Sequence, residues 1–293
     1  MAKRFEGKVV VVTGASSGIG AAAARMFASE GAAVVLAARS AAPLERLALE
    51  IESGGGRALA MPGDVADIDG ARRLVERAAE RFGGIDVLVN NAGANKRGPI
   101  ERFTPEELVS VVQINLSAPI ALARLVLPHM KKRGRGAIVN VASIAGRIPV
   151  LHEAVYSATK FGLRAFSFAL REELAGERIT VSAVSPGPVD TGFITEDLDH
   201  VPDVIFAQPM SSAEDIAGLV LDCAADGAAE RVMPQVTGFL ATAGYLFPAL
   251  QKLVVPLMEG RGRAVKEEFR KRKAAAAGAG PAAEVRKEAG GQS

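Results

Sequence analysis

Residues 9–20 read Val-Val-Val-Val-Thr-Gly-Ala-Ser-Ser-Gly-Ile-Gly and decide the fold of the chain. Four consecutive β-branched residues are typical of a strand that is buried on both faces, as in a parallel sheet. The glycines that follow have the spacing of a strand-to-helix turn in which the backbone approaches a pyrophosphate and the helix packs close to the sheet. We therefore expect a phosphate-bearing cofactor to contact Gly14, Ser16, Ser17, Gly18, Ile19 and Gly20.

Short apolar runs and helical stretches alternate along most of the chain. Runs typical of buried strands occur at 9–12, 33–37, 58–61, 85–89, 137–141 and 179–184, and a last strand is expected at 231–237. Helical spacing occurs at roughly 18–30, 43–53, 67–82, 104–131, 154–175 and 213–226. This alternation predicts a doubly wound α/β domain of Rossmann type with a mainly parallel, seven-stranded sheet. We expect residues 1–237 to form one dinucleotide-binding catalytic domain.

The composition excludes several classes of protein. Of 293 residues, 49% are hydrophobic, and 35 Lys and Arg nearly balance 33 Asp and Glu. This balance gives no electrostatic reason to bind nucleic acid. Cys223 is the single cysteine and the three histidines show no ligand spacing, so we expect no metal. No secretory signal is visible, which together with the lone cysteine indicates a cytoplasmic protein.

The end of the second expected strand indicates which nicotinamide cofactor fits. A site for NAD usually carries Asp or Glu about twenty residues after the glycine-rich turn, where the carboxylate accepts from the ribose 2′-hydroxyl. This chain has Arg39 and Ser40 there. A cation and a hydroxyl donor suit a 2′-phosphate and favour NADP over NAD. A solvated arginine at a strand end is the alternative interpretation.

Tyr156 and Lys160 lie four residues apart at the start of an expected helix and therefore project from one face. At roughly 4 Å and an effective dielectric constant of about 20, an attraction of about 4 kcal/mol would favour the phenolate. It would lower the tyrosine pKa from about 10 to about 7, where the phenol serves as an acid or a base. By itself, a Tyr and Lys at this spacing is most often a surface pair.

Further motifs accompany this pair in a fixed order. They are Asn90-Asn91-Ala92-Gly93 after the fourth strand, Asn115 in the long helix, Ser143 after the fifth strand and Pro186-Gly187 after the sixth. Together with the glycine-rich turn, the series resembles the short-chain dehydrogenase/reductase family, which combines TGxxxGxG, NNAG, a catalytic Asn, a Ser, YxxxK and a following PG. The resemblance covers roughly residues 6–225.

The resemblance implies a role for each catalytic residue. Ser143 would hold the substrate carbonyl oxygen and Tyr156 would protonate it, while the nicotinamide delivers hydride to the carbon. Lys160 would lower the tyrosine pKa and bind the nicotinamide ribose, and Asn115 would hold a water that relays protons from Lys160. Taken singly, each of these residues also fits a cap, a turn or a surface position.

The resemblance also implies cofactor contacts outside the glycine-rich turn. Asp64 and Val65 would lie against the adenine. The residues bordering the rest of the cofactor would be Asn90, Ala92, Gly93, Tyr156, Lys160, Pro186, Gly187, Val189 and Thr191. In the family the helix after Lys160 often joins a subunit interface, so a homodimer or homotetramer is expected.

The chain continues beyond the usual family pattern. Residues 238–260 form an apolar segment that Pro248 and Pro256 interrupt. Three interpretations stay open: a lid over an apolar pocket, a subunit contact, and an interfacial membrane anchor, which is the least favoured. Residues 261–293 contain nine Lys or Arg and four Glu, a net charge of +5, so with a total of +2 the first 260 residues carry −3. We expect this basic, Ala- and Gly-rich tail to be disordered.

These features favour an NADP-dependent oxidoreductase that interconverts a carbonyl and a secondary alcohol; a lid would make the substrate a lipophilic ketone or aldehyde. A catalytically inactive NADP-binding regulator is the alternative, but it has no need of a Ser, Tyr and Lys at catalytic spacing. A sugar-nucleotide epimerase or dehydratase fits less well because the chain is shorter. The specific substrate depends on loops 94–100, 144–153 and 188–212, whose shapes do not follow from the sequence.

Overall fold

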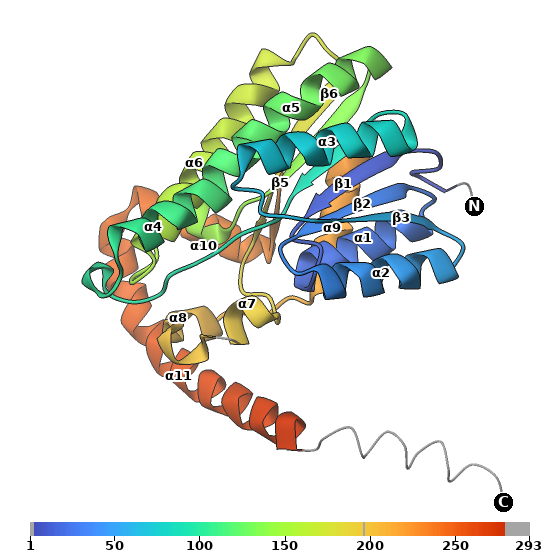
Figure 1. Cartoon of the computed structure of the whole chain (residues 1–293). Coiled ribbons are helices and arrows are strands. Elements are labelled where there is room, and N and C mark those ends of the chain that lie inside the picture. Colours follow the sequence, from blue (N-terminus) through green and yellow to red (C-terminus); the bar gives the residue numbers. More distant parts are fainter. Residues whose placement is uncertain (1–2, 196, 279–293) are drawn as a thin grey trace, which may run out of the picture.

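Parallel strands form one sheet at the centre of the protein (Figure 1). The computed structural model describes residues 3–195 and 197–278. The strands are β1 (Val9–Thr13), β2 (Ala33–Ala38), β3 (Arg57–Pro62), β4 (Val87–Asn90), β5 (Gly136–Val141), β6 (Ile179–Pro186) and β7 (Glu230–Met233). Their order is β3-β2-β1-β4-β5-β6-β7, and every neighbouring pair is parallel. The predicted doubly wound α/β fold is confirmed, and the order reverses between β1 and β4, where such sheets open a crevice.

Helices cover both faces of this sheet (Figure 1). They are α1 (Gly18–Ser29), α2 (Ala41–Ser53), α3 (Ile68–Phe82), α4 (Pro105–Val112), α5 (Ala118–Arg133), α6 (Ala154–Glu173) and α9 (Ala213–Asp226). Val10 and Val12 belong to a buried cluster with residues of α1, α2 and α9. Val11, which points the other way, belongs to a second cluster with residues of α3, α5 and α6. Because both faces are covered, β1 and β2 consist almost entirely of apolar residues.

The long helix expected over 104–131 is present but not uniform. Thr104 and Glu107 form a capping box at the start of α4. A π-helical segment, Gln113–Ser117, then joins α4 to α5. Among the described residues, this combined helix of 29 residues is the one that is long and apolar enough to cross a membrane. It packs against α3 and the sheet, and this packing in the core explains its apolar composition.

The last strand is shorter than the sequence indicates. Instead of 231–237, β7 covers Glu230–Met233. Pro234 ends the strand because it has no N–H to donate to a neighbouring strand. It is the N-cap of the next helix, α10 (Gln235–Leu246), so the apolar segment expected from residue 238 starts inside a helix.

Residues 248–278 form a long helix, α11 (Pro248–Gly278). The helix includes the first part of the basic tail expected from residue 261, as far as Gly278, and residues 279–293 lie outside the described part. The helix has an anchor that its composition does not suggest, because Phe269 joins a buried cluster with Val201 and Phe206. These partners belong to loop 188–212, which contains α7 (Gly192–Thr195) and α8 (Asp203–Phe206). α11 runs beside α8 (Figure 1).

Candidate active site

A cavity of about 950 Å³ lies along the carboxyl ends of the strands. Most of the residues predicted for the site line it, namely Gly14, Ser16, Ser17, Gly18, Ile19, Arg39, Ser40, Asp64, Val65, Ala92, Gly93, Ser143, Tyr156, Lys160, Pro186, Gly187, Val189 and Thr191. Within the described ranges, Gly20, Asn90 and Asn115 do not line it. These three residues lie behind the wall and contact other parts of the fold.

The turn after β1 leaves room for a phosphate. Gly14 and Gly18 have φ angles of +66° and +53°, which residues with side chains rarely adopt. A Cβ on Gly20 would overlap the backbone oxygen of Gly14, so α1 packs closely against the turn. The side-chain amide of Asn91 donates to the backbone oxygens of Thr13 at 2.9 Å and Gly14 at 3.3 Å. These contacts fix the turn in front of the amino end of α1.

Thr13 and Asn91, which sequence reasoning did not single out, tie this turn to β4. Thr13 Oγ1 accepts hydrogen bonds from the backbone N–H groups of Asn91 and Ala92, both at 3.0 Å. The sequence contains a signal for both residues, since Asn91 belongs to the NNAG motif and Thr13 precedes the first glycine of the glycine-rich turn. Asn90 lies differently: its amide donates to Asn140 Oδ1 at 2.9 Å, and the residue is buried under the wall of the cavity.

The adenosine end of the predicted site is open to solvent. Arg39 and Ser40 are exposed on the rim of the cavity, just after β2. Among the described residues, no carboxylate pairs with Arg39, so its guanidinium is available to an anion. Asp64 Oδ1 accepts from the N–H of Ala66 at 2.9 Å, and this turn holds Val65 at the same rim.

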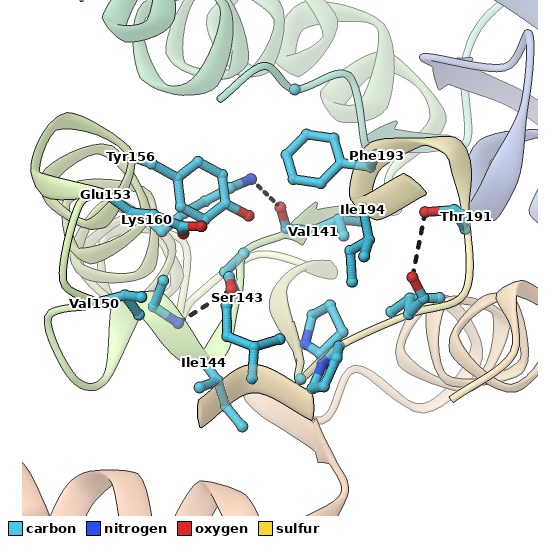
Figure 2. Close-up of a pocket in the computed structure, with 18 of the residues that line it drawn as sticks. Val141, Ser143, Ile144, Val150, Glu153, Tyr156, Lys160, Thr191, Phe193 and Ile194 are labelled. Carbon is cyan, nitrogen blue, oxygen red and sulfur yellow. Dashed lines mark hydrogen bonds between the residues drawn. The ribbon is translucent and has the colours of Figure 1, made fainter. Parts of the chain in front are cut away.

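Ser143, Tyr156 and Lys160 converge on one side of the cavity (Figure 2). Ser143 caps the short 3₁₀ helix Ile144–Gly146, where its Oγ accepts from the N–H of Ala145 at 3.1 Å. The hydroxyl hydrogen can still be donated. Tyr156 and Lys160 project from the first turns of α6, as their spacing predicts. The Ser143 side chain also acts on the ionisation of Tyr156, because it lowers the pKa of the phenol.

The ionisation of this pair differs from the simple expectation. Burial above all, and then the Glu153 carboxylate, raise the pKa of Tyr156 to about 12, against a smaller opposing effect of Ser143. Burial also lowers the pKa of Lys160 to about 8. Lys160 Nζ lies 5.6 Å from the Tyr156 ring centroid and donates to the backbone oxygen of Val141 at 2.8 Å (Figure 2). Desolvation therefore outweighs the attraction that would bring the tyrosine pKa to about 7.

Asn115 is fully buried in the π-helical segment. Its Oδ1 accepts from the N–H of Ala94 at 2.8 Å, and its Nδ2 donates to the oxygen of Ala94 at 2.8 Å and to Thr159 Oγ1 at 3.1 Å. The amide thus clamps the chain after β4 to α6. A Cβ added at Gly93, on this clamped stretch, would lie 3.9 Å from Lys160 Nζ. The proton-relay role of Asn115 stays a prediction.

A buried ion pair that the sequence does not reveal borders the cavity. Arg97 Nε donates to Glu153 Oε1 at 2.8 Å, and the two side chains are 6% and 4% exposed. Arg97 also donates to the backbone oxygen of Phe193 at 2.9 Å. The Phe193 ring lies 5.9 Å from the Tyr156 ring (Figure 2). Because the partners of Arg97 are 56 and 96 residues away in the chain, no local motif predicts this link.

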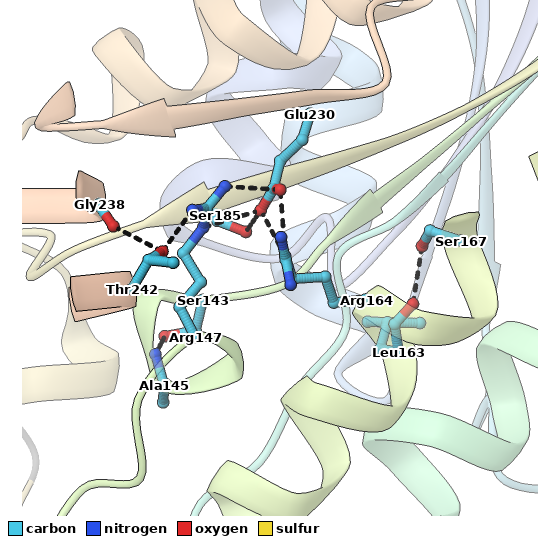
Figure 3. A network of polar contacts seen from close by, with 10 residues as sticks. All are labelled: Ser143, Ala145, Arg147, Leu163, Arg164, Ser167, Ser185, Glu230, Gly238 and Thr242. Atoms are coloured by element: carbon cyan, nitrogen blue, oxygen red, sulfur yellow. Dashed lines mark hydrogen bonds and ion pairs between the residues drawn. The ribbon is translucent and has the colours of Figure 1, made fainter. Parts of the chain in front are cut away.

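A second polar network positions the loop that carries Ser143 (Figure 3). Glu230, at the start of β7, pairs with Arg147 at 2.6 Å and with Arg164 at 2.9 Å. The hydroxyl of Ser185 donates to the same carboxylate at 2.7 Å. Arg147 also donates to Thr242 Oγ1 of α10 at 2.9 Å. The network therefore joins the Ser143 loop to α6, β6, β7 and α10.

The fold and the cavity define a nucleotide-binding oxidoreductase site, with a glycine-rich turn at one end and a Ser, Tyr and Lys cluster at the other. Within the described residues, no three His, Cys, Asp or Glu side chains are grouped to hold a metal ion. A family model described as short chain dehydrogenase matches residues 8–201. The chain therefore belongs to the short-chain dehydrogenase/reductase family and is an oxidoreductase.

Individual relatives agree with this assignment. The chain is 42% identical over 191 residues to the ketoacyl reductase HetN of a Nostoc species, a match that covers 65% of this chain and 67% of the relative. It is 35% identical over 232 residues to the 3-oxoacyl-[acyl-carrier-protein] reductase FabG of Thermotoga maritima, covering 76% and 92%.

Solved structures of similar proteins contain a nicotinamide cofactor. A metagenomic short-chain oxidoreductase in complex with NADP is 34% identical, with a TM-score of 0.68 and coverage of 78% of this chain and 98% of that one. L-sorbose reductase from Gluconobacter frateurii, complexed with NADPH and L-sorbose, is 32% identical, with a TM-score of 0.72 and coverage of 80% and 97%.

Proposed function

We propose that the protein uses NADPH to reduce a carbonyl group to an alcohol, which is a secondary alcohol when the substrate is a ketone, and NADP⁺ for the reverse reaction. The convergence of Ser143, Tyr156 and Lys160 on the cavity that also contains the phosphate turn carries this proposal. One carbonyl oxygen can meet a hydrogen-bond donor and a proton donor there. The NADP-bound structures of similar proteins support the choice of cofactor.

The residues around the cavity fit such a cofactor. A Cβ at Gly18 would lie 3.2 Å from the Thr191 side chain, so the glycine keeps this passage open. Ser17 is the N-cap of α1, and within the described residues it makes no side-chain cap hydrogen bond. The first N–H groups of α1 are therefore available to a pyrophosphate. The exposed guanidinium of Arg39 suits the 2′-phosphate that distinguishes NADP from NAD.

The chemistry of reduction divides between the cofactor and three side chains. A bound nicotinamide supplies the hydride. Ser143 donates a hydrogen bond to the carbonyl oxygen, and Tyr156 transfers its phenolic proton to that oxygen. With a pKa of about 12, Tyr156 is protonated at neutral pH, as a proton donor must be. Lys160, still mostly protonated at neutral pH, stabilises the phenolate that remains and donates to the ribose.

The substrate end of the cavity favours a lipophilic ketone or aldehyde. Apolar side chains line it, namely Ile144, Ile148, Val150, Leu151, Ile194, Val204, Ile205, Leu240 and Met258. α10 contributes Leu240 and Ala241, which supports the interpretation that this helix is part of a lid. Phe239 and Phe247 are 74% and 64% exposed and do not line the cavity, so the lid role falls to the inner face of α10.

The outer face of α10 supports a proposal about the oligomeric state of the protein. Phe239, Leu246 and, just after the helix, Phe247 are exposed and do not line the cavity. We propose that a second copy of the chain covers them in a cytoplasmic homodimer or homotetramer. Light scattering after size-exclusion chromatography should then give a mass at least twice that of one chain. A monomer that sediments with lipid vesicles would instead favour peripheral membrane contact.

A substrate screen tests the proposed activity directly. Ketones, aldehydes and secondary alcohols of increasing chain length are offered with NADPH or NADP⁺, and in parallel with NADH or NAD⁺. The absorbance of the reduced nicotinamide reports turnover. We expect turnover with the phosphorylated cofactor that rises with the chain length of an apolar carbonyl. A protein that binds NADPH but turns over none of these compounds would contradict the proposal and favour a regulatory role.

A further inference from the structure

The outer wall of the substrate end is built from a very short element. α8 has only four residues, and Pro202, Val204, Ile205 and Ala207, in and beside it, line the cavity. A single helical turn is not stable by itself, because its first hydrogen bond requires the ordering of several residues. Another part of the protein must therefore hold α8 in place.

One face of α11 supplies this support. Among the α11 residues whose side chains the structure describes, the buried or half-buried ones recur three or four positions apart and form a stripe, which consists of Met258, Glu259, Gly262, Val265, Lys266 and Phe269. Met258 and Glu259 line the cavity themselves. Because α11 runs beside α8 (Figure 1), the stripe extends from the cavity along α8.

Gly262 sets how closely the two helices approach. A Cβ there would overlap the backbone oxygen of Asp203 and would lie 3.2 Å from the backbone nitrogen of Ala207. Glycine weakens the interior of a helix relative to alanine. The φ angle of Gly262 is not in the left-handed region, so the backbone of α11 does not require glycine at this position. The close contact with α8 is what requires a glycine here.

Lys266 holds the segment that leads into α8. Its Nζ donates to the backbone oxygen of Val201 at 2.6 Å and to that of Asp199 at 3.4 Å. It also donates to Asp203 Oδ1 at 3.3 Å. An ammonium has three hydrogens, and these three acceptors use them all. Lys266 is only 9% exposed, so water cannot readily replace it as their partner.

Apolar contact continues the same attachment farther along α11. The Phe269 and Phe206 rings lie 5.7 Å apart in the buried cluster that also contains Ile194. Arg263 pairs with Asp203 as well, at 3.2 Å, but its side chain is 78% exposed. An exposed pair contributes little to stability, so the buried ammonium is the main polar attachment.

We propose that α11 is part of the substrate-binding site, and that Lys266 is the positioning residue that holds α8 as the wall of that site. This inference rests on the proposed reduction of apolar carbonyls. The family match ends at residue 201, so α8 and its support lie outside it. Selectivity for long apolar substrates should therefore depend on a helix that contributes no catalytic residue.

Lys266→Met tests the proposal, with Arg263→Met as the matched control. Both remove a cation of α11 that contacts Asp203, but one is buried and the other exposed. Hydrogen exchange of the full-length, cofactor-free protein is followed by mass spectrometry. In Lys266→Met, amides of residues 198–207 should exchange roughly tenfold faster than in the wild type, whereas Arg263→Met should leave them within about twofold. Unchanged exchange in β1 and α1 shows that the fold is intact.

Kinetics provide the second readout. Lys266→Met should raise the KM for a long apolar ketone at least about fivefold more than that for a short polar one, with kcat and NADPH affinity within about twofold. If Lys266→Met does not fold, Gly262→Ala, which forces α11 away from Asp203, should give the same pattern.

Two results would overturn the inference. One is exchange over 198–207 that is the same in Lys266→Met and Arg263→Met. The other is faster exchange with equal effects on long and short substrates, since α11 would then hold α8 without shaping the substrate site. Absence of any carbonyl turnover in the wild type would instead reject the proposed function, and the exchange comparison would still decide whether Lys266 holds α8.

Discussion

Replacement of Glu230 by glutamine should destabilise the protein and loosen the loop that carries Ser143. The Glu230 side chain is 8% exposed and pairs with Arg147 and Arg164, which are 16% and 29% exposed. Breaking a fully buried pair costs about 3–5 kcal/mol, and partial access of water to the two guanidiniums reduces this to about 2–3 kcal/mol. At about 2–4 °C per kcal/mol for a chain of this size, Tm should fall by roughly 4–12 °C.

Thermal unfolding followed by circular dichroism measures this effect at neutral pH. Glu177→Gln is the control, because Glu177 pairs with Lys131 at 2.6 Å but the side chains are 35% and 52% exposed. The loss of such a pair should cost less than about 1 kcal/mol. Equal shifts in Tm for Glu230→Gln and Glu177→Gln would refute the idea that the Glu230 network stabilises the fold.

The same network predicts that the stability of the protein depends on pH. Burial alone would raise the pKa of Glu230, but hydrogen bonds from Arg164, Ser185 and Arg147 hold it below its ordinary value of 4.5. The folded state thus favours the carboxylate. Its stabilising effect is fully present above pH 4.5 and is lost as the pH falls through the lower pKa of the folded protein. The difference in unfolding free energy between the wild type and Glu230→Gln should shrink in that acidic range, as urea unfolding at several pH values can show.

Other changes test separate parts of the structure. Arg39→Asp should reverse a preference for NADPH over NADH of roughly tenfold or more, since a charge-assisted hydrogen bond contributes about 1.5–3 kcal/mol; equal affinities in the wild type, measured by fluorescence titration, would contradict the assignment of Arg39. Gly20→Ala should weaken NADPH binding in the same titration, because the new Cβ overlaps the oxygen of Gly14; unchanged affinity would show that the turn tolerates displacement. Between pH 8 and 10.5, Lys160 binds fewer protons in the folded state than in the unfolded state. The unfolding free energy of the wild type should therefore rise with pH relative to that of Lys160→Met, by up to about 3 kcal/mol. If the unfolding free energies of the two proteins changed in parallel with pH, this would argue against a buried ammonium at Lys160. Phe239→Ser should leave the KM for apolar substrates unchanged, because the ring faces away from the cavity; a large increase in KM would place it in the lid.

Much of the fold follows from local patterns in the sequence. The buried runs at 9–12 and 33–37 coincide with β1 and β2 to within one residue, because a strand covered on both faces is composed mostly of apolar residues. The glycine spacing likewise predicts the turn after β1. The strand ends were harder to predict, and β7 stops at Met233 because Pro234 cannot pair.

The site was predictable only where its residues lie close together in the chain. Tyr156 and Lys160 share a helix face as their spacing requires, but their pKa values depend on burial, which the spacing does not contain. Arg97 and Glu230 escaped prediction because their partners come from distant segments. The order of α11 also depends on distant contacts. In the sequence, Lys266 lies among charged residues typical of a solvated tail, but in the folded protein its ammonium contacts Val201 and Asp203 at α8.

The most direct test of the proposed activity compares Tyr156→Phe with the wild type in single-turnover carbonyl reduction. The variant loses only the hydroxyl, so NADPH affinity, measured by fluorescence titration, should stay within about twofold. The rate of NADPH oxidation with the best carbonyl from the screen should fall by roughly 10²–10⁴, because the proton donor is gone. Tyr156→Phe that binds NADPH normally and keeps more than about a tenth of the wild-type rate would contradict the assignment of Tyr156 as the proton donor.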